Sequence, residues 1–424
     1  MKAARRARRG GGLDLEVAKV VAREACSGCG ACCLLDPGLT MTLDEAGFSR
    51  PRRTAPHTLG PEEERRAVHR FRAACPGVTV RAVHDAPWHP ALGPIAACWR
   101  AWATDPELRF QGSSGGALSA LAAWLLQTGH AAQVVGAAAA PDPRHTVPVR
   151  IANRDEVLAS AGSRYAPTSI AASAAGATFR DVIIGKPCEA SALRALADYD
   201  GAEAPLLLSF LCAGTPSQHA TDELVEHLGL EPAAKLTELR YRGHGWPGRF
   251  VARSEDGREV SASYDEAWGQ HLGTRIQWRC RICPDGVGES SDITAGDLWR
   301  TDSRGYPVFA DEAGTSTLIA RTPRGRAVVE QAIAAGVLVA VPIDPEEIAA
   351  VQPLHRRRRA TLSGRLLGAW LAGLRPPRYR GFRLFAHAMA NPLSSLRVAR
   401  GSYLRARAAR RTSTDPKVRS GGTE

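Results

Sequence analysis

The chain has 424 residues, a length that suggests about two or three domains, and 44% of them are apolar, which is ordinary for a globular protein. Its net charge of +12 is concentrated near the C-terminus, because fifteen arginines and no acidic residue lie between Arg356 and Arg411. This basic segment matches no recognisable nucleic-acid-binding module, so we do not expect a nucleic-acid partner.

Neither a membrane span nor a secretory signal is visible in the sequence. The most apolar runs, such as 117–126 and 366–374, are far shorter than the about 20 residues that a transmembrane helix needs. The basic residues 1–12 are not followed by the apolar stretch of a signal peptide, which predicts a cytoplasmic protein. Thiols stay reduced in the cytoplasm, so the ten cysteines are interpreted as metal ligands before disulfides.

Helical and strand patterns follow a basic arm, residues 1–12, that we expect to be disordered. Residues 38–90 show little periodicity and predict loops with short helices. Helices are predicted at 13–23, 62–72, 117–128, 190–199, 215–228 and 324–335. Strands are predicted at 133–140, 181–185, 205–211 and 317–321, with antiparallel strands within 237–263.

The recurring order of strand, small-residue loop and helix predicts an α/β fold with α+β elements and a mostly parallel sheet. Cys188 and Cys212 each follow a predicted strand, and the carboxyl ends of parallel strands form the usual ligand site, so we expect the two thiols to meet. We divide the chain into an N-terminal arm with a ferredoxin-like cysteine-rich segment, a flavin-binding catalytic core with a loop-rich cluster region, and an Arg-rich extension, at residues 1–105, 106–350 and 351–424.

The sharpest motif is Cys26-Ser-Gly-Cys29-Gly-Ala-Cys32, whose spacing places three thiolates around one tight turn, as in the opening of bacterial ferredoxin motifs. Cys75, which precedes a proline, is the candidate fourth ligand of a 4Fe–4S cluster. A zinc site and free thiols are the alternatives, although zinc sites usually offer paired C-x₂-C units. Cys33 is an alternative to Cys32, and Cys98 to Cys75.

A second C-x₂-C unit, Cys280 and Cys283, lacks two ligands for a cluster. Cys188 and Cys212 can supply them if they meet at the strand ends, which would complete a second 4Fe–4S site. Half a zinc site, a redox-active pair and buried free thiols remain the alternative interpretations.

A glycine- and serine-rich loop before the helix at 117–128 lets a phosphate approach backbone amides at the positive helix end. An ordinary N-capping turn is the alternative. The loop residues that we assign to a cofactor are Gly112, Ser113, Ser114, Gly115 and Gly116.

Four further residues are candidates for contact with the cofactor or the substrate. Arg164 is a candidate phosphate clamp, and Tyr165 a residue that stacks on or hydrogen-bonds to a ring. Lys186 is the candidate catalytic residue, because its charge can stabilise an anionic reduced flavin or a phosphate. Asp297 can orient ribityl or ribose hydroxyls. The alternatives are surface turns and a solvated loop lysine.

From Cys26 to Asp297 the chain resembles the coenzyme F-420 hydrogenase/dehydrogenase beta-subunit family. The resemblance rests on an ordered set of segments: CSGCGAC, GSSGG, GSRYAPTS, IIGKPCEASALRAL, FLCAGTPS and CRICPDGVGESSDITAGD. It implies FAD, one or two 4Fe–4S clusters, and flavin or substrate contacts from the GSSGG loop and Lys186. It also implies that Cys188, Cys212, Cys280 and Cys283 bind the cluster nearest the flavin.

These features together predict an oxidoreductase that passes electrons between 4Fe–4S clusters, FAD and an organic two-electron substrate or carrier, such as the deazaflavin coenzyme F-420. The alternative is a non-catalytic electron-transfer subunit that docks on a larger redox enzyme. The expected partners are a ferredoxin or such an enzyme complex. The Arg-rich extension has three interpretations: an arm that docks on an acidic partner, a membrane-surface anchor, and a solvated terminus.

Overall fold

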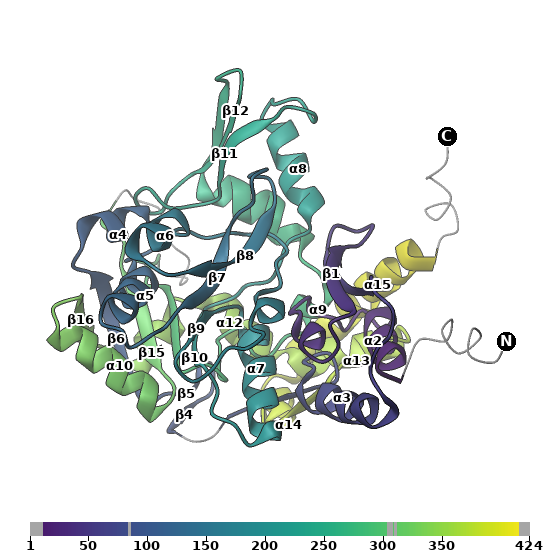
Figure 1. The fold of residues 1–424 in the computed structure, drawn as a ribbon. Coiled ribbons are helices and arrows are strands. Elements are labelled where there is room, and N and C mark those ends of the chain that lie inside the picture. Colours follow the sequence, from purple (N-terminus) through teal and green to yellow (C-terminus); the bar gives the residue numbers. More distant parts are fainter. Residues whose placement is uncertain (1–11, 84–85, 303–307, 309–311, 415–424) are drawn as a thin grey trace.

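The computed structural model describes residues 12–83, 86–302, 308 and 312–414 (Figure 1). The basic arm predicted at 1–12 therefore lies outside the described residues, apart from Gly12. Within the described part of the chain, no helix combines the length and the apolar character needed to cross a bilayer.

The largest element is an eight-stranded mixed sheet. Its strands lie in the order β16 (Leu338–Pro342), β6 (Ala97–Ala103), β15 (Ser316–Ala320), β14 (Ile293–Asp297), β10 (Leu206–Phe210), β9 (Val182–Ile184), β7 (Val134–Ala139) and β8 (Thr146–Ile151).

The central strands β14, β10, β9 and β7 are parallel to one another, whereas every other pair in the sheet is antiparallel. The prediction of a mostly parallel sheet is therefore wrong for the outer strands. The short turn between β7 and β8 shows the reason, because a parallel neighbour requires a long crossover connection whereas an antiparallel one needs only a hairpin.

Alternate residues of the central strands point to opposite faces of the sheet. Val134, Val182 and Leu206 pack with α5 (Ala117–Gln127) and α10 (Pro323–Ala334) on one face. Their neighbours Val135, Ile183 and Leu207 pack on the other face with three helices, α7 (Pro187–Asp200), α2 (Gly12–Ala22) and α3 (Pro61–Ala74). The N-terminal segment thus shares a core with the sheet and is not a separate body.

Residues 38–90 contain more regular structure than the sequence predicts. Besides α3, they form the antiparallel hairpin of β1 (Leu39–Leu43) and β2 (Ser49–Arg53), in which Met41 faces Pro51. Arginines and a proline in β2 conceal the strand pattern from a sequence analysis. The shorter strands that follow are β3 (Thr79–Arg81), β4 (Trp88–His89) and β5 (Gly93–Pro94).

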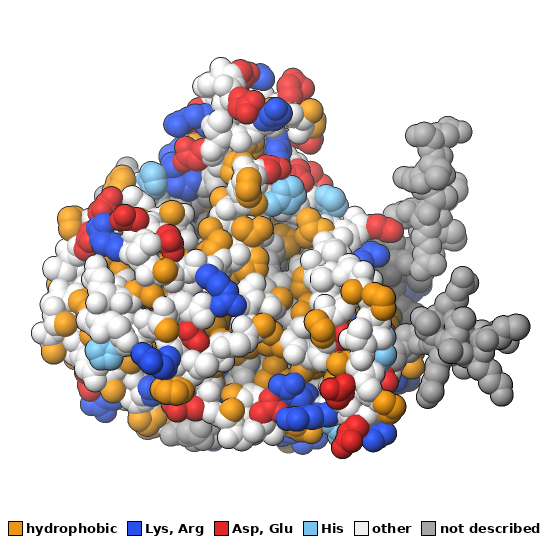
Figure 2. All heavy atoms as spheres, viewed as in Figure 1, with side chains coloured by type: hydrophobic (Ala, Val, Ile, Leu, Met, Phe, Trp, Pro, Cys, Tyr) orange, Lys and Arg blue, Asp and Glu red, His pale blue; other side chains and the backbone are white. Residues whose placement is uncertain are grey.

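A small antiparallel sheet projects from the molecule, as predicted for residues 237–263. It consists of β11 (Leu236–Arg240), β12 (Phe250–Ser254) and β13 (Glu259–Ala262), and it packs on α8 (Gln218–His227). The projection stands at the top of Figure 1, and Figure 2 shows charged side chains of both signs mixed over it. The smaller helices are α4 (Pro106–Gln111), α6 (Arg154–Ala159), α9 (Trp278–Arg281), η1 (Ala31–Leu34), η2 (Ile170–Ser173), η3 (Asp265–His271) and η4 (Leu272–Arg275).

The C-terminal extension is folded onto the rest of the chain. It follows α11 (Pro345–Ala350) and contains α12 (Pro353–Ala360), α13 (Leu362–Leu371), β17 (Arg378–Arg380), α14 (Leu384–Ala390) and α15 (Pro392–Thr414). Strand β17 pairs in parallel with β3 of the N-terminal segment, and His355, Arg358 and Arg359 are buried. The interpretation of this extension as a solvated terminus is therefore wrong for its first half.

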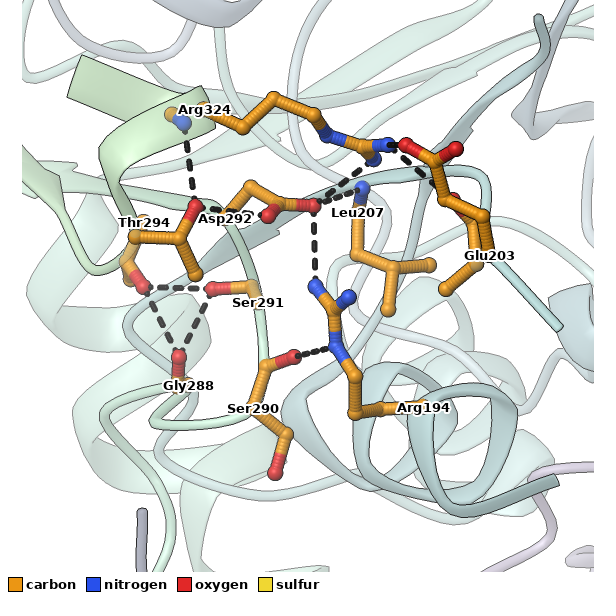
Figure 3. A network of polar contacts seen from close by, with 12 residues as sticks. Arg194, Glu203, Leu207, Gly288, Ser290, Ser291, Asp292, Thr294 and Arg324 are labelled. Carbon is orange, nitrogen blue, oxygen red and sulfur yellow. Dashed lines mark hydrogen bonds and ion pairs between the residues drawn. The ribbon is translucent and has the colours of Figure 1, made fainter. Parts of the chain in front are cut away.

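A buried polar network fixes the start of β14 to its neighbours (Figure 3). The Asp292 carboxylate accepts hydrogen bonds from the Leu207 amide at 2.9 Å and from the Thr322 hydroxyl at 2.7 Å. It also pairs with the guanidinium groups of Arg194 at 3.0 Å and Arg324 at 3.1 Å. Asp292 is 1% exposed, so these contacts replace its lost hydration. The carboxylate of Asp292 is therefore engaged with groups of the protein and is not available to the hydroxyl groups of a ligand.

Candidate functional site

A cavity in the N-terminal segment is lined by four cysteines: Cys26, Cys29, Cys32 and Cys75. Cys26 and Cys29 come from the turn between α2 and η1, Cys32 lies in η1, and Cys75 caps the C-terminus of α3. Gly30 adopts a φ of 85°, and a Cβ there would lie 2.8 Å from Ala172 Cβ, so the turn can close only with glycine. Most of the remaining lining is apolar.

Backbone amides donate to three of the four thiols, those of Cys26, Cys29 and Cys75. Burial raises the pKa of Cys29 to about 11, and it also raises the pKa values of Cys26 and Cys75. The Gly28 amide donates to Cys26 Sγ at 3.4 Å, and two amides after Cys75 donate to its sulfur. Such thiols stay protonated unless a cationic centre binds them as thiolates, so this donor set fits an iron–sulfur cluster.

The two cysteines proposed as substitutes are placed differently. The Cys33 thiol hydrogen-bonds to Cys32, which raises the pKa of Cys32 well above its ordinary value. Cys98 lies in β6 and donates its S–H to the Ile343 carbonyl at 3.0 Å. Neither belongs to the described lining of the cavity.

The second group of cysteines gathers at the carboxyl ends of the neighbouring strands β9 and β10. Cys188 lies in the first turn of α7, Cys212 follows β10, and Cys280 and Cys283 belong to α9 and the loop after it. Burial, with the charges of Cys280 and Cys283 as the next causes, raises the pKa of Cys212 to about 12. Cys280 Sγ accepts hydrogen bonds at 3.4 Å from the Thr215 amide and the Gln277 side chain.

Two buried side chains join the cysteine groups. The Gln277 amide nitrogen that donates to Cys280 also donates to the Ser27 carbonyl at 2.9 Å. Arg279 donates to the carbonyl of Pro76 at 3.0 Å, and its interactions with Cys283 and Cys188 help to raise its pKa against the opposing effect of burial. The charge of Cys29 contributes to the raised pKa of Cys188. The two cysteine groups are therefore neighbours in the structure.

Among the described residues, no three His, Cys, Asp or Glu side chains are gathered closely enough to hold a single metal ion.

Lys186 lies beside the second group, buried at 7% exposure. Its ammonium donates to Glu189 Oε1 and to the Thr168 carbonyl, both at 2.7 Å. Burial would lower its pKa, but the negative charges of Glu189 and the nearby Cys188 raise it. The alternative of a solvated loop lysine is therefore wrong, and the chain holds a cation next to these thiols.

Three glycine-rich loops converge at the N-terminus of α5: residues 111–116, 162–165 and 241–248. The Ser113 and Ser163 hydroxyls lie 2.7 Å apart. A Cβ on Gly162 would lie 3.0 Å from the Arg242 carbonyl oxygen, and one on Gly243 would lie 2.4 Å from the carbonyl oxygen of Gln111. Gly116 precedes α5 without a side-chain cap, and Gly115, Gly116 and Ala117 are buried at this positive helix end, where the Gly115 amide donates to the Ser316 hydroxyl at 2.9 Å.

Replacing Gly115 with alanine should destabilise the protein by about 1–3 kcal/mol, because the added Cβ would lie within 3 Å of two backbone atoms. The Cβ would be 2.7 Å from the Ala101 carbonyl oxygen and 2.8 Å from the Ser316 nitrogen. Gly136→Ala is the matched control, since its nearest neighbour is a flexible side chain at 3.4 Å. Thermal unfolding measures both variants, and equal midpoints would contradict the expectation.

Arg164 and Tyr165 are engaged with the protein. Arg164 donates to the Leu239 carbonyl at 2.7 Å, to the Thr146 hydroxyl at 3.0 Å and to two further carbonyls, and it stacks over Tyr241. This arrangement argues against the predicted phosphate clamp. The Tyr165 ring packs against Trp268 and Tyr241.

Asp297, at the end of β14, forms a bidentate ion pair with Arg242 at 2.9 and 3.0 Å. Arg242 is 2% exposed and lies over the Tyr264 and Trp299 rings. The loop that follows Arg242 lines a large open pocket together with Phe110 and β12. No sequence motif predicts this loop, although its glycines at 243, 245 and 248 are a visible signal of an unusual backbone.

Comparison with known proteins places these features in a family. Two models that describe the beta subunit of coenzyme F420 hydrogenase/dehydrogenase match the chain, the N-terminal one at residues 98–174 and the C-terminal one at residues 180–346. The matched residues include all four cysteines of the second group. The first group lies before them in the chain and consists of Cys26, Cys29, Cys32 and Cys75. The chain also resembles a chain of the F420-reducing NiFe hydrogenase complex from Methanosarcina barkeri, with a TM-score of 0.50, 22% identity and coverage of 64% and 91% of the two chains. This likeness concerns the fold alone.

Curated relatives agree with the family models. A coenzyme F420 hydrogenase subunit beta from Methanococcus voltae is 26% identical over 251 residues, 57% of this chain and 82% of that relative. Its counterpart from Methanothermobacter thermautotrophicus is 25% identical over 265 residues, 60% and 86% of the two chains. The F420-dependent formate dehydrogenase 1 subunit beta of Methanococcus maripaludis is 22% identical, over 54% and 57%. The chain therefore belongs to the coenzyme F420 hydrogenase/dehydrogenase beta-subunit family, as its motifs predict.

Proposed function

We propose that this chain is an iron–sulfur flavoprotein oxidoreductase that passes electrons between two 4Fe–4S clusters, FAD and an organic two-electron carrier of the coenzyme F420 type. The observation that carries the proposal is the gathering of eight cysteines into two adjacent groups, one around a cavity and one at the carboxyl ends of two parallel strands. The names of the relatives, F420-dependent hydrogenase and formate dehydrogenase subunits, support the choice of carrier.

Two sets of four cysteines would bind the clusters. Soft thiolates select iron–sulfur centres, and amides that point at sulfur stabilise the thiolate form. The contacts from Gly28 to Cys26 and from Thr215 to Cys280 are of this kind. The proposed ligands are Cys26, Cys29, Cys32 and Cys75 for one cluster, and Cys188, Cys212, Cys280 and Cys283 for the other.

The flavin would be held where the glycine-rich loops converge. A bound flavin exchanges single electrons with clusters and electron pairs with organic carriers. In the loop Gly112–Gly116, the Gly112 amide donates to the Leu108 carbonyl and the Gly115 amide to the Ser316 hydroxyl, so Ser113, Ser114 and Gly116 would meet the phosphates of the flavin cofactor at the start of α5. Asp297 and Tyr165 both contact Arg242 of the third loop, whose guanidinium lies 3.5 Å from the Tyr165 hydroxyl. Lys186 keeps a positive charge beside Cys188, where it opposes the accumulation of negative charge on reduction.

A second candidate function is that of an electron-transfer subunit without a substrate of its own. The observation that favours it is that the relatives are named as subunits, and that the structure of similar fold belongs to a hydrogenase complex. Its partner would be a larger redox enzyme or a ferredoxin.

Cofactor analysis of the full chain purified without oxygen tests the proposal. We expect about eight irons, a matching amount of acid-labile sulfide and one FAD per chain, with a cluster signal in electron paramagnetic resonance after reduction. Reduction of coenzyme F420 by the dithionite-reduced chain should then be visible as the loss of its absorbance. Zinc without sulfide or flavin would overturn the proposal, and full cofactor content without any reaction with F420 would favour the second function.

A further inference from the structure

The C-terminal helices α13 and α15 pack unusually closely. A Cβ on Gly364 would lie 2.0 Å from the Ser395 carbonyl oxygen, and one on Gly368 would lie 2.2 Å from that of Ala399. Both contacts advance by four residues in the same direction, so the two helices run parallel. This small-residue contact holds α15 against α13, which in turn packs on α9 through Leu362 and Ala369.

Among the described side chains of α15, one stripe is buried against the rest of the chain. Its buried residues recur at helical spacing: Ser395, Ala399, Ser402 and Ala406. The opposite face carries four exposed side chains at positions i, i+4, i+7 and i+11: Leu393, Arg397, Arg400 and Leu404. The outer face of α15 thus carries leucine and arginine side chains side by side.

Large apolar side chains are exposed on all three helices of this region, which contact one another. Phe385 of α14 is 80% exposed, Leu393 is 79% exposed and Trp370 of α13 is 64% exposed. We define the C-terminal apolar surface as Leu367, Trp370, Leu371, Phe385, Met389, Leu393, Leu396 and Leu404. Single exposed apolar side chains are normal on protein surfaces, but a group of them on adjoining helices indicates an interaction surface.

The charge around this surface has one sign. The exposed arginines of the region are Arg356, Arg357, Arg375, Arg378, Arg380, Arg383, Arg397, Arg400, Arg405 and Arg407, and no acidic residue occurs between 356 and 411. Among the described ion pairs, only Arg356 of this set has an acidic partner, Glu346 at 4.0 Å. The partner that neutralises these charges must therefore be anionic.

We propose that the C-terminal apolar surface binds the face of an anionic lipid bilayer. Exposed tryptophan, phenylalanine and leucine next to arginine are what an interfacial helix presents, with its apolar side chains entering the acyl boundary and its cations meeting the headgroups. The side chains stand out from helices and line neither described pocket, so they suit a deformable bilayer better than a shaped protein partner. The described helices lie on such a surface and do not span it.

Vesicle flotation tests the proposal on the full chain with its cofactors retained. We expect the protein to float with vesicles of phosphatidylcholine mixed with phosphatidylglycerol, and to stay behind with phosphatidylcholine alone. Lipids brominated in the acyl chain should quench part of the tryptophan fluorescence, and this part should disappear in Trp370→Phe.

Two pairs of variants separate the apolar from the electrostatic contribution. Trp370→Ser with Phe385→Ser should lower the fraction bound at least about tenfold, because both side chains are highly exposed and would enter the lipid. The matched control is Phe179→Ser with Tyr199→Ser, two exposed aromatic side chains outside the surface. Arg397→Gln with Arg400→Gln should also weaken binding, against the control Arg52→Gln with Arg65→Gln.

The proposal is overturned if the chain binds both kinds of vesicle equally or binds neither. Weakening by the arginine pair without any effect of the aromatic pair would also overturn it, and would favour an acidic protein partner. None of these variants touches a cysteine group, so iron content should stay that of the parent chain. The inference is thus independent of the proposed redox function.

Discussion

Cys75→Ala should remove about four irons and four labile sulfides per chain, half of the expected content, while leaving the flavin bound. Cys75 is separated from the other three ligands of its cavity by more than forty residues, yet α3 brings its thiol into the same lining. The variant would leave the cluster with three protein ligands, and the described lining of the mostly apolar cavity offers no further cysteine to replace the missing thiolate. Iron and sulfide analysis, with electron paramagnetic resonance after reduction, measures the loss.

Cys33→Ala is the matched control for this experiment, because Cys33 adjoins the same turn but does not line the described cavity. Its iron content should equal that of the parent chain. If Cys33→Ala loses the four irons and Cys75→Ala keeps them, the assignment of ligands to this cavity is wrong. Circular dichroism of both variants establishes that the chain remains folded.

Asp292→Asn should lower the free energy of unfolding by about 2–4 kcal/mol, the second large effect that we expect. The Leu207 amide and the Thr322 hydroxyl donate to different oxygens of the carboxylate, so the neutral side-chain amide of the variant, with one acceptor oxygen, can accept only one of these two hydrogen bonds. It leaves the guanidinium groups of Arg194 and Arg324 without the charge that compensates their partial burial, since they are 26% and 30% exposed. The network of Figure 3 holds the start of β14 against β10, so the effect should be global.

Urea unfolding followed by circular dichroism measures this loss. Asp142→Asn is the control, because Asp142 lies in a turn with its side chain 54% exposed, and its midpoint should hardly move. An unchanged midpoint for Asp292→Asn would show that the two arginines find other partners. Since Asp292 lies at the opposite end of the sheet from Cys212, iron content should be retained in the folded variant.

The cysteine groups could be predicted from the sequence because spacing and strand order constrain thiols strongly. Cys26, Cys29 and Cys32 share one turn, and Cys188 and Cys212 follow adjacent strands, so their positions follow from local structure. Cys75 could be proposed as the fourth member because a proline follows it, although only the packing of α3 on α2 explains its position.

The sequence did not reveal contacts that depend on long-range packing. Asp297 stays a predicted site residue, and its partner Arg242, 55 positions away in a loop without a known motif, could not be predicted. Arg164 looked like a phosphate ligand, whereas its donors are used by carbonyls of two other segments. The antiparallel direction of the outer strands could not be predicted. The direction of a strand depends on the path by which the chain re-enters the sheet, and this path is set by contacts between segments far apart in the sequence.

The arginines of the C-terminal extension have a further consequence for how this protein can be shortened. Arg358 donates to the Ala213 carbonyl, Arg359 to that of Pro284 and Arg365 to that of Arg281, each next to or near a cysteine of the second group. These hydrogen bonds tie the extension to the backbone segments that carry Cys212 and Cys283. Deleting the extension would expose those loops as well as remove the C-terminal apolar surface, so the properties of a shortened chain would also reflect damage to the second cysteine group.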